Sequence, residues 1–216
     1  MKRILVTLFL ALSILAGSFA LLHTSLIHAA PIGSLSGTVG AQPATVNLTT
    51  EGTLDWVYWY NVGTNITFEH KSVATQSISN YTAVGKGTVS FAKRATNFKW
   101  TDGTPKVKGF MDKGLYVAGL NNGFQLTVPA GTTPQTLKVY VGVTNAQGKL
   151  TATLSDSSAT PYTDSSLNIT SGTELGMYTI TYNAASINQT LTITFIVQAN
   201  QPKVTSRVIL QAATLH

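Results

Sequence analysis

Residues 137–144 read LKVYVGVT, and an apolar side chain occupies every second position of this stretch from Leu137 to Val143. Successive side chains of an extended strand point to opposite faces of its sheet. The alternation therefore predicts a β-strand that buries one face and presents Lys138 and Thr144 on the other.

The same alternation recurs along most of the chain, with threonine on the outer positions, where it suits a pleated surface. It is clearest in 124–128, 150–154, 178–182 and 191–197. Turn residues separate these runs, as in 121–123 and 145–148, and the second turn has the length of a hairpin connection. The pattern predicts an all-β fold, an antiparallel β-sandwich of the jelly-roll type. With no cysteine in the chain, packing and sheet hydrogen bonds must stabilise it.

The first residues resemble a targeting segment. Lys2 and Arg3 precede an apolar stretch over 4–14, and a small-residue region without acids follows. This order predicts a secretory signal peptide over 1–29, with Ala20 and Ala30 as alternative last residues, and hence a secreted protein that has no membrane contact after leader removal. An uncleaved membrane anchor is the rival interpretation, but four polar residues interrupt the apolar run. They are His23, Thr24, Ser25 and His28.

The rest of the chain divides into two parts. Residues 30–43 are rich in Gly, Ser, Thr and Pro, which predicts a linker. Residues 44–216 are enough for one β-sandwich domain with a sizeable core.

The chain carries a formal charge of +6, and its cations are unevenly distributed. Seven lysines and arginines lie between Lys86 and Lys113, where only Asp102 and Asp112 oppose them. Such a patch suits an anionic polysaccharide or a phosphate-bearing envelope polymer, although solvated loops give the same pattern. No recognition motif for nucleic acid is present, so no nucleic-acid partner is expected.

The usual catalytic residues are scarce, so we expect no enzyme and no cofactor. There is no cysteine, and the expected domain holds two histidines, His70 in its interior and His216 at its end. A serine triad and a zinc site both need more than that. Two carboxyl groups converging in one cleft would indicate a glycosidase instead. Structural calcium bound by loop oxygens is a further alternative, but no dense Asp/Asn run supports it.

The segment from Asp55 to Tyr60 reads DWVYWY and holds two of the three tryptophans. If it is extended, Trp56 shares a face with Tyr58 and Tyr60, and Trp59 lies on the opposite face. Aromatic rings stack on the faces of sugars, and neighbouring polar side chains hydrogen-bond the hydroxyl groups. The same rings are equally suited to the core of a sandwich, so both interpretations are kept.

Several of these segments resemble a recurrent domain of secreted bacterial proteins for which no activity is established. The resemblance covers residues 44–216, and Tyr58 departs from it, since a histidine is expected there. The matching pieces include 52–59, 68–71, 98–105, 114–117, 122–124, 137–142, 154–156 and 208–215. The closing strand, 208–215, is similar to the last strand of galactose-binding-like jelly rolls. That similarity implies two antiparallel sheets and a ligand site on loops at one end.

These observations lead to a carbohydrate-binding hypothesis without catalysis. The ligand would be an extracellular glycan or envelope polymer. Trp56, Trp59 and Trp100 would stack on sugars, and Asp55, His70 and Asp102 would bind hydroxyl groups. The alternative is a structural or adhesive domain of the cell envelope that contacts other proteins. The sequence leaves the oligomeric state open.

Overall fold

The computed structural model describes residues 32–73, 75–201 and 205–216, so the predicted signal peptide lies outside the described residues. Within them the chain is almost entirely β-structure, and no described helix is long and apolar enough to cross a membrane. The elements are β1 (Ser34–Ala41), β2 (Thr45–Asn47), α1 (Leu48–Glu51), β3 (Asp55–Val62), β4 (Asn65–Lys71), β5 (Thr82–Val84), β6 (Ser90–Trp100), β7 (Gly103–Thr104), β8 (Gly109–Ala118), β9 (Gly123–Ala130), β10 (Gln135–Thr144), β11 (Ala146–Leu154), β12 (Tyr162–Asp164), β13 (Thr173–Asn183), β14 (Gln189–Asn200) and β15 (Arg207–Leu215).

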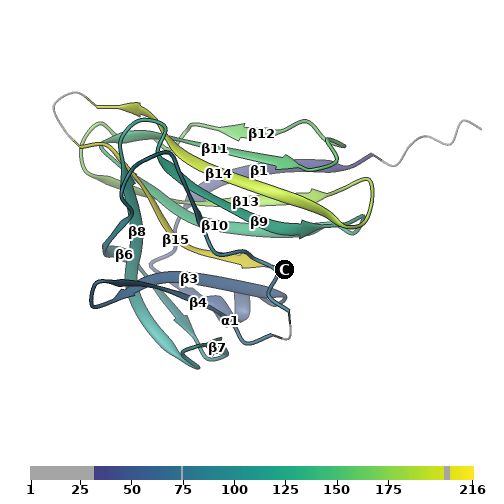
Figure 1. Ribbon diagram of the computed structural model, residues 1–216, viewed down its shortest axis with the longest axis horizontal. Helices are drawn as coiled ribbons and strands as arrows, with labels where there is room; N and C mark the ends of the chain where they lie inside the picture. The colour runs from purple at the N-terminus through teal and green to yellow at the C-terminus, as the bar shows by residue number, and fades with distance from the viewer. Residues whose placement is uncertain (1–31, 74, 202–204) are drawn as a thin grey trace, which may run out of the picture.

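Two sheets pack face to face, which confirms the predicted antiparallel β-sandwich. The larger one, sheet A, has the order β1-β13-β10-β15-β3-β4-β7 and branches to β8, β6 and β2. The smaller one, sheet B, has the order β12-β11-β14-β9-β5. Figure 1 shows β11, β14 and β9 stacked over β13, β10 and β15. Among the described strands, all pairings are antiparallel except that of β2 with β6.

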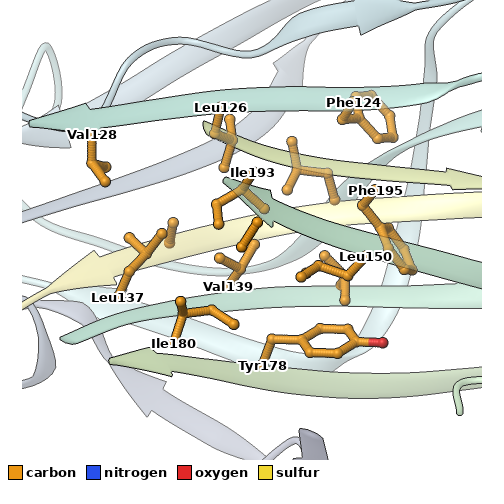
Figure 2. Close-up of a cluster of buried hydrophobic side chains, with 14 of the residues drawn as sticks. Phe124, Leu126, Val128, Leu137, Val139, Leu150, Tyr178, Ile180, Ile193 and Phe195 are labelled. Atoms are coloured by element: carbon orange, nitrogen blue, oxygen red, sulfur yellow. The ribbon is translucent and has the colours of Figure 1, made fainter. Parts of the chain in front are cut away.

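The main core lies between these sheets and follows the alternation in the sequence. Figure 2 shows Leu126 and Ile193 from sheet B meeting Val139 and Ile180 from sheet A. The side chains at the intervening positions, such as Thr192, point outward and are partly exposed. Burial of apolar surface between the sheets is the main force that stabilises the domain.

Sheet A forks at β15, and the fork creates a second core. The first half of β15 pairs with β8, and its second half pairs with β3. The β6–β8 hairpin continues past the sandwich toward β7, as Figure 1 shows. It covers the face of sheet A that points away from sheet B. A second cluster of buried side chains fills that space, and its members are Val46, Leu48, Trp56, Tyr58, Tyr60, Phe98, Trp100, Tyr140 and Ala212.

The prediction of a linker over residues 30–43 is wrong for its described part. Residues 34–41 form β1, which pairs with β13 along its whole length. Small residues serve packing here, because a Cβ added at Gly37 would lie 2.5 Å from the ring of Tyr162. Composition alone suggested a flexible segment, since glycine and serine are common in both settings.

The turn at residues 145–148 does not close a hairpin. Asn145 adopts a φ of 48°, as its type allows, but β10 lies in sheet A and β11 in sheet B. Strands β9, β10 and β11 therefore alternate between the sheets, as do β13, β14 and β15. A short turn can connect two strands of one sheet or two facing sheets, and its length does not distinguish them.

Candidate functional site

The three tryptophans predicted to stack on sugars are all buried. Trp56 and Trp59 are 0% exposed, and Trp100 is 2% exposed. Trp56 and Trp100 lie in the second core and Trp59 in the main core, so β3 has its predicted two faces but buries both. A ring without an exposed face cannot stack on a sugar, so the core interpretation describes all three rings in this conformation.

Trp56 and Trp100 pack against each other, with ring centroids 5.5 Å apart. Gly109 closes the outer side of Trp100, because a Cβ at this position would lie only 2.2 Å from its ring. Each indole N–H also has an acceptor. Trp100 donates to the carbonyl oxygen of Lys106 at 2.8 Å, and Trp59 donates to Asn80 at the same distance. The polar edges of these rings are therefore used inside the fold.

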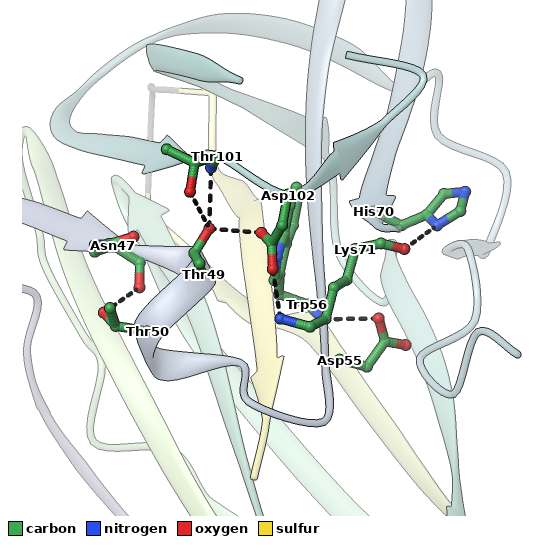
Figure 3. Close-up of polar contacts among 9 residues, drawn as sticks. All are labelled: Asn47, Thr49, Thr50, Asp55, Trp56, His70, Lys71, Thr101 and Asp102. Atoms are coloured by element: carbon green, nitrogen blue, oxygen red, sulfur yellow. Dashed lines mark hydrogen bonds and ion pairs between the residues drawn. The ribbon is translucent and has the colours of Figure 1, made fainter. Parts of the chain in front are cut away.

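Asp102, between β6 and β7, is the acceptor for Trp56 and joins three segments of the chain (Figure 3). Its carboxylate accepts hydrogen bonds from Trp56 Nε1 at 2.9 Å and from Thr49 Oγ1 at 2.5 Å. It also forms an ion pair with Lys71 Nζ at 2.6 Å. Partial burial alone would raise the pKa of Asp102, but the hydrogen bonds from Lys71, Thr49 and Trp56 together lower it below its ordinary value.

Asp55 and His70 lie close to this cluster in the sequence but make other contacts. Asp55 is 0% exposed and accepts backbone N–H groups from Trp56, Ser77 and Ile78, so both carboxylate oxygens are occupied. Burial raises the pKa of Asp55, although these three hydrogen bonds oppose the rise. The His70 ring lies 2.9 Å from the Lys71 carbonyl oxygen and points away from Asp102 in Figure 3. Sugar contacts by His70 and Asp102 stay predictions.

A buried carboxylate supports the loop that follows Asp102. Glu69 is 0% exposed and accepts hydrogen bonds from the backbone N–H of Lys106 and, at 3.1 Å, from the hydroxyl of Tyr60. Burial raises the pKa of Glu69, and the hydrogen bonds from Lys106 and Tyr60 counteract this. Since Trp100 also binds the carbonyl of Lys106, both backbone groups of this residue are held. Buried side chains therefore hold the backbone of this loop in place, while its outer surface faces solvent.

Replacing Asp102 with alanine is expected to lower the free energy of unfolding by about 3 kcal/mol, because it leaves the buried N–H of Trp56 and the ammonium group of Lys71 without an acceptor. Asp102→Asn keeps one acceptor and should cost less. Urea denaturation measures both.

The lowered pKa means that ionised Asp102 stabilises the fold fully above about pH 4 and loses this effect as the pH falls further. Asp102→Asn should remove this loss of stability at low pH. If the variant and the wild type lose stability equally as the pH falls, ionised Asp102 does not contribute as argued.

A hollow of about 600 Å³ opens over this supported loop, and we call it the basic groove. Lys99, Lys106 and Lys108 line it with exposed side chains, and Phe110, which is 66% exposed, forms its rim. The full lining is Asn47, Lys99, Trp100, Thr101, Lys106, Lys108, Gly109 and Phe110. The contacts below this surface are thus structural, and the surface itself is cationic.

A second hollow of about 520 Å³ adjoins the basic groove, and Lys106 and Phe110 line both. Lys93 and Lys113 add two more cations to it, and Asp112 supplies one opposing charge. The ring of Phe110 thus lies between two cationic hollows. Sequence reasoning located the basic stretch but missed Phe110, because nothing in its neighbourhood distinguishes an exposed phenylalanine from a buried one.

The lysines of the basic groove have no carboxylate partner. All eight acidic residues lie in the described part of the chain, and the ion pairs formed there join Lys71 to Asp102, Lys93 to Asp112 and Lys138 to Glu51. Lys99, Lys106 and Lys108 therefore take part in none of the ion pairs of the described residues. A surface of this kind attracts anions.

No three His, Cys, Asp or Glu side chains among the described residues lie close enough to hold a metal ion, so the structure adds no support to the calcium alternative. A scan against protein-family models and a search of curated proteins found no match to this chain.

Proposed function

We propose that this protein is a secreted, non-catalytic binding domain for an anionic glycan, which it holds in the basic groove. The observation that carries the proposal is the unpaired trio Lys99, Lys106 and Lys108 around a hollow with an exposed aromatic ring. Uronate, sulfate or phosphate groups on the glycan would be its charged contacts.

The groove has the two features that sugar recognition requires. Phe110 offers an exposed ring on which a sugar face can stack, and Asn47 and Thr101 supply polar groups for hydroxyls. This replaces stacking on the buried tryptophans with stacking on a different residue. Because the lysines are exposed, their contribution should weaken steeply as salt screens the charges. The predicted leader supports export, and the family resemblance is consistent with an extracellular partner.

Charge reversal in the basic groove is expected to weaken binding strongly. The variant Lys99→Glu/Lys108→Glu should lower the affinity for heparin and polygalacturonate at low salt by at least about tenfold, or about 1.4 kcal/mol. Phe110→Ala should weaken binding by a smaller factor. Retention on columns of the two immobilised polymers, followed by titration calorimetry, measures both effects.

The matched control changes the same net charge elsewhere. Lys86 is exposed, Lys149 lies on β11, and neither lines the basic groove. Lys86→Glu/Lys149→Glu should therefore retain most of the affinity. Equal losses of affinity in the two double variants would show a non-specific charge effect. Wild-type protein that binds neutral dextran as tightly as it binds the two polyanions would also argue against the proposal.

A further inference from the structure

Two arginines, one from β6 and one from β15, lie against one tyrosine ring of β8. The guanidinium carbons of Arg94 and Arg207 are 5.6 and 4.6 Å from the ring centroid of Tyr116. None of the chain's eight acidic side chains, all of them in the described part, forms an ion pair with either arginine. Burial lowers the pKa of Arg94, the Tyr116 hydroxyl opposes this, and the charge of Arg207 lowers it further. The two positive charges repel each other, and an anion lying near both would offset this repulsion.

Several buried polar atoms beside these arginines lack partners. Gln211 is 0% exposed, and neither its Nε2 nor its Oε1 forms a hydrogen bond with any described residue. The Nε atoms of Arg94 and Arg207 are buried and unpartnered in the same way. Buried polar groups in folded proteins are almost always hydrogen-bonded, so this set of donors and one acceptor indicates a missing partner.

The side chains of Gln211 and Arg94 both lie next to Gly114 of β8. A Cβ added at Gly114 would lie 2.7 Å from Cγ of Gln211 and 3.5 Å from Cγ of Arg94. The two side chains therefore flank the same bare stretch of β8, on the face that also carries Tyr116. Arg94 itself lies where the pairing of β6 with β8 is interrupted, between Lys93 and Phe98.

The strand register places Arg207 on the same face. Ala118, two residues after Tyr116, is the direct partner of Arg207, and direct partners share a face of the sheet. The row continues through Thr144 to Thr173. Thr173 lines a hollow of about 340 Å³ together with Arg94, so this hollow opens over the face that carries both arginines. Its other lining residues are Lys93, Ala95, Asp112 and Leu175.

We propose that Arg94, Arg207 and Gln211 form a binding site for one oxyanionic group, namely a phosphate, sulfate or carboxylate. Guanidinium groups hold such anions through paired N–H donors, and the amide of Gln211 supplies a further donor. Lys93 and Asp112 line both this hollow and the second hollow, so a polyanion lying in the basic groove could place a charged group here. The site does not depend on the proposed function, because a free anion is sufficient to fill it.

Thermal unfolding in sodium phosphate, sulfate and acetate, each compared with sodium chloride at equal ionic strength, tests the site. The wild-type midpoint should rise with at least one oxyanion, since a ligand that binds only the folded state stabilises it. A larger rise with phosphate and sulfate indicates a tetrahedral group, and a larger rise with acetate indicates a carboxylate. Arg207→Gln and Arg94→Gln should each lower the affinity for the anion by at least tenfold, and Arg207→Lys should lower it by less. Titration calorimetry measures these affinities.

The control is Lys99→Gln/Lys108→Gln, which removes charge from the basic groove and should keep the oxyanion effect. The inference is overturned if no oxyanion raises the wild-type midpoint, or if the rise survives in both arginine variants. A rise lost in the lysine variant but kept in the arginine variants would place the anion in the basic groove, which overturns this site and supports the proposed function. A wild-type protein that shows the oxyanion effect but binds no glycan would support the arginine site and contradict the proposed function.

Discussion

Replacing Asp55 with alanine is expected to lower the free energy of unfolding by about 4 kcal/mol or more. Its carboxylate accepts three backbone N–H groups, at 2.8 Å from Trp56, 2.7 Å from Ser77 and 2.8 Å from Ile78. Hydrogen bonds to a charged group contribute about 1.5–3 kcal/mol each, and the donors would be left buried without an acceptor. Urea denaturation monitored by tryptophan fluorescence measures the loss.

Asp55→Asn provides the matched comparison because it keeps the shape of the side chain but only one oxygen. Its amide group would face a backbone N–H donor, so we expect it to recover only part of the lost stability. Ser77 and Ile78 belong to the segment between β4 and β5, which should become sensitive to proteolysis in both variants. A loss below about 1 kcal/mol for Asp55→Ala would show that the carboxylate does not hold this segment.

Replacing Trp56 with alanine is expected to cost about 4 kcal/mol, within the range found when a buried aromatic side chain is truncated. Trp56 is 0% exposed, packs on Trp100 and donates to Asp102. Trp56→Phe keeps most of the packing and loses the hydrogen bond, so about 1–2 kcal/mol is expected. The same denaturation experiment measures both variants.

Phe110→Ala is the control for the effect of removing an aromatic ring. Phe110 is 66% exposed, so its truncation should change stability by less than about 0.5 kcal/mol. The pair of variants separates core from surface: Trp56→Ala should lower stability, and Phe110→Ala should weaken glycan binding without lowering stability. A stable Trp56→Ala protein that has lost glycan binding would restore the original stacking hypothesis for this tryptophan.

The alternation of side chains was enough to predict both the fold class and the faces of individual strands. Val139 and Ile180 point into the main core as expected. On β3, Trp56 and Trp59 lie on opposite faces, as the two-residue period requires. These features depend only on the direction in which neighbouring side chains point, a property of extended backbone that can be read residue by residue.

What covers each face was decided by the tertiary structure alone. The fork at β15 lets β6 and β8 fold over the outer face of sheet A, and this buries Trp56 and Trp100 in a second core. Trp56 and Trp100, which were predicted to stack on sugars, lie in this second core, while Phe110 remained exposed. A local pattern states that two side chains share a face, but contacts between distant strands determine whether that face meets protein or water. The chain's own sequence thus determined a sandwich, and only its folding decided where a ligand can reach it.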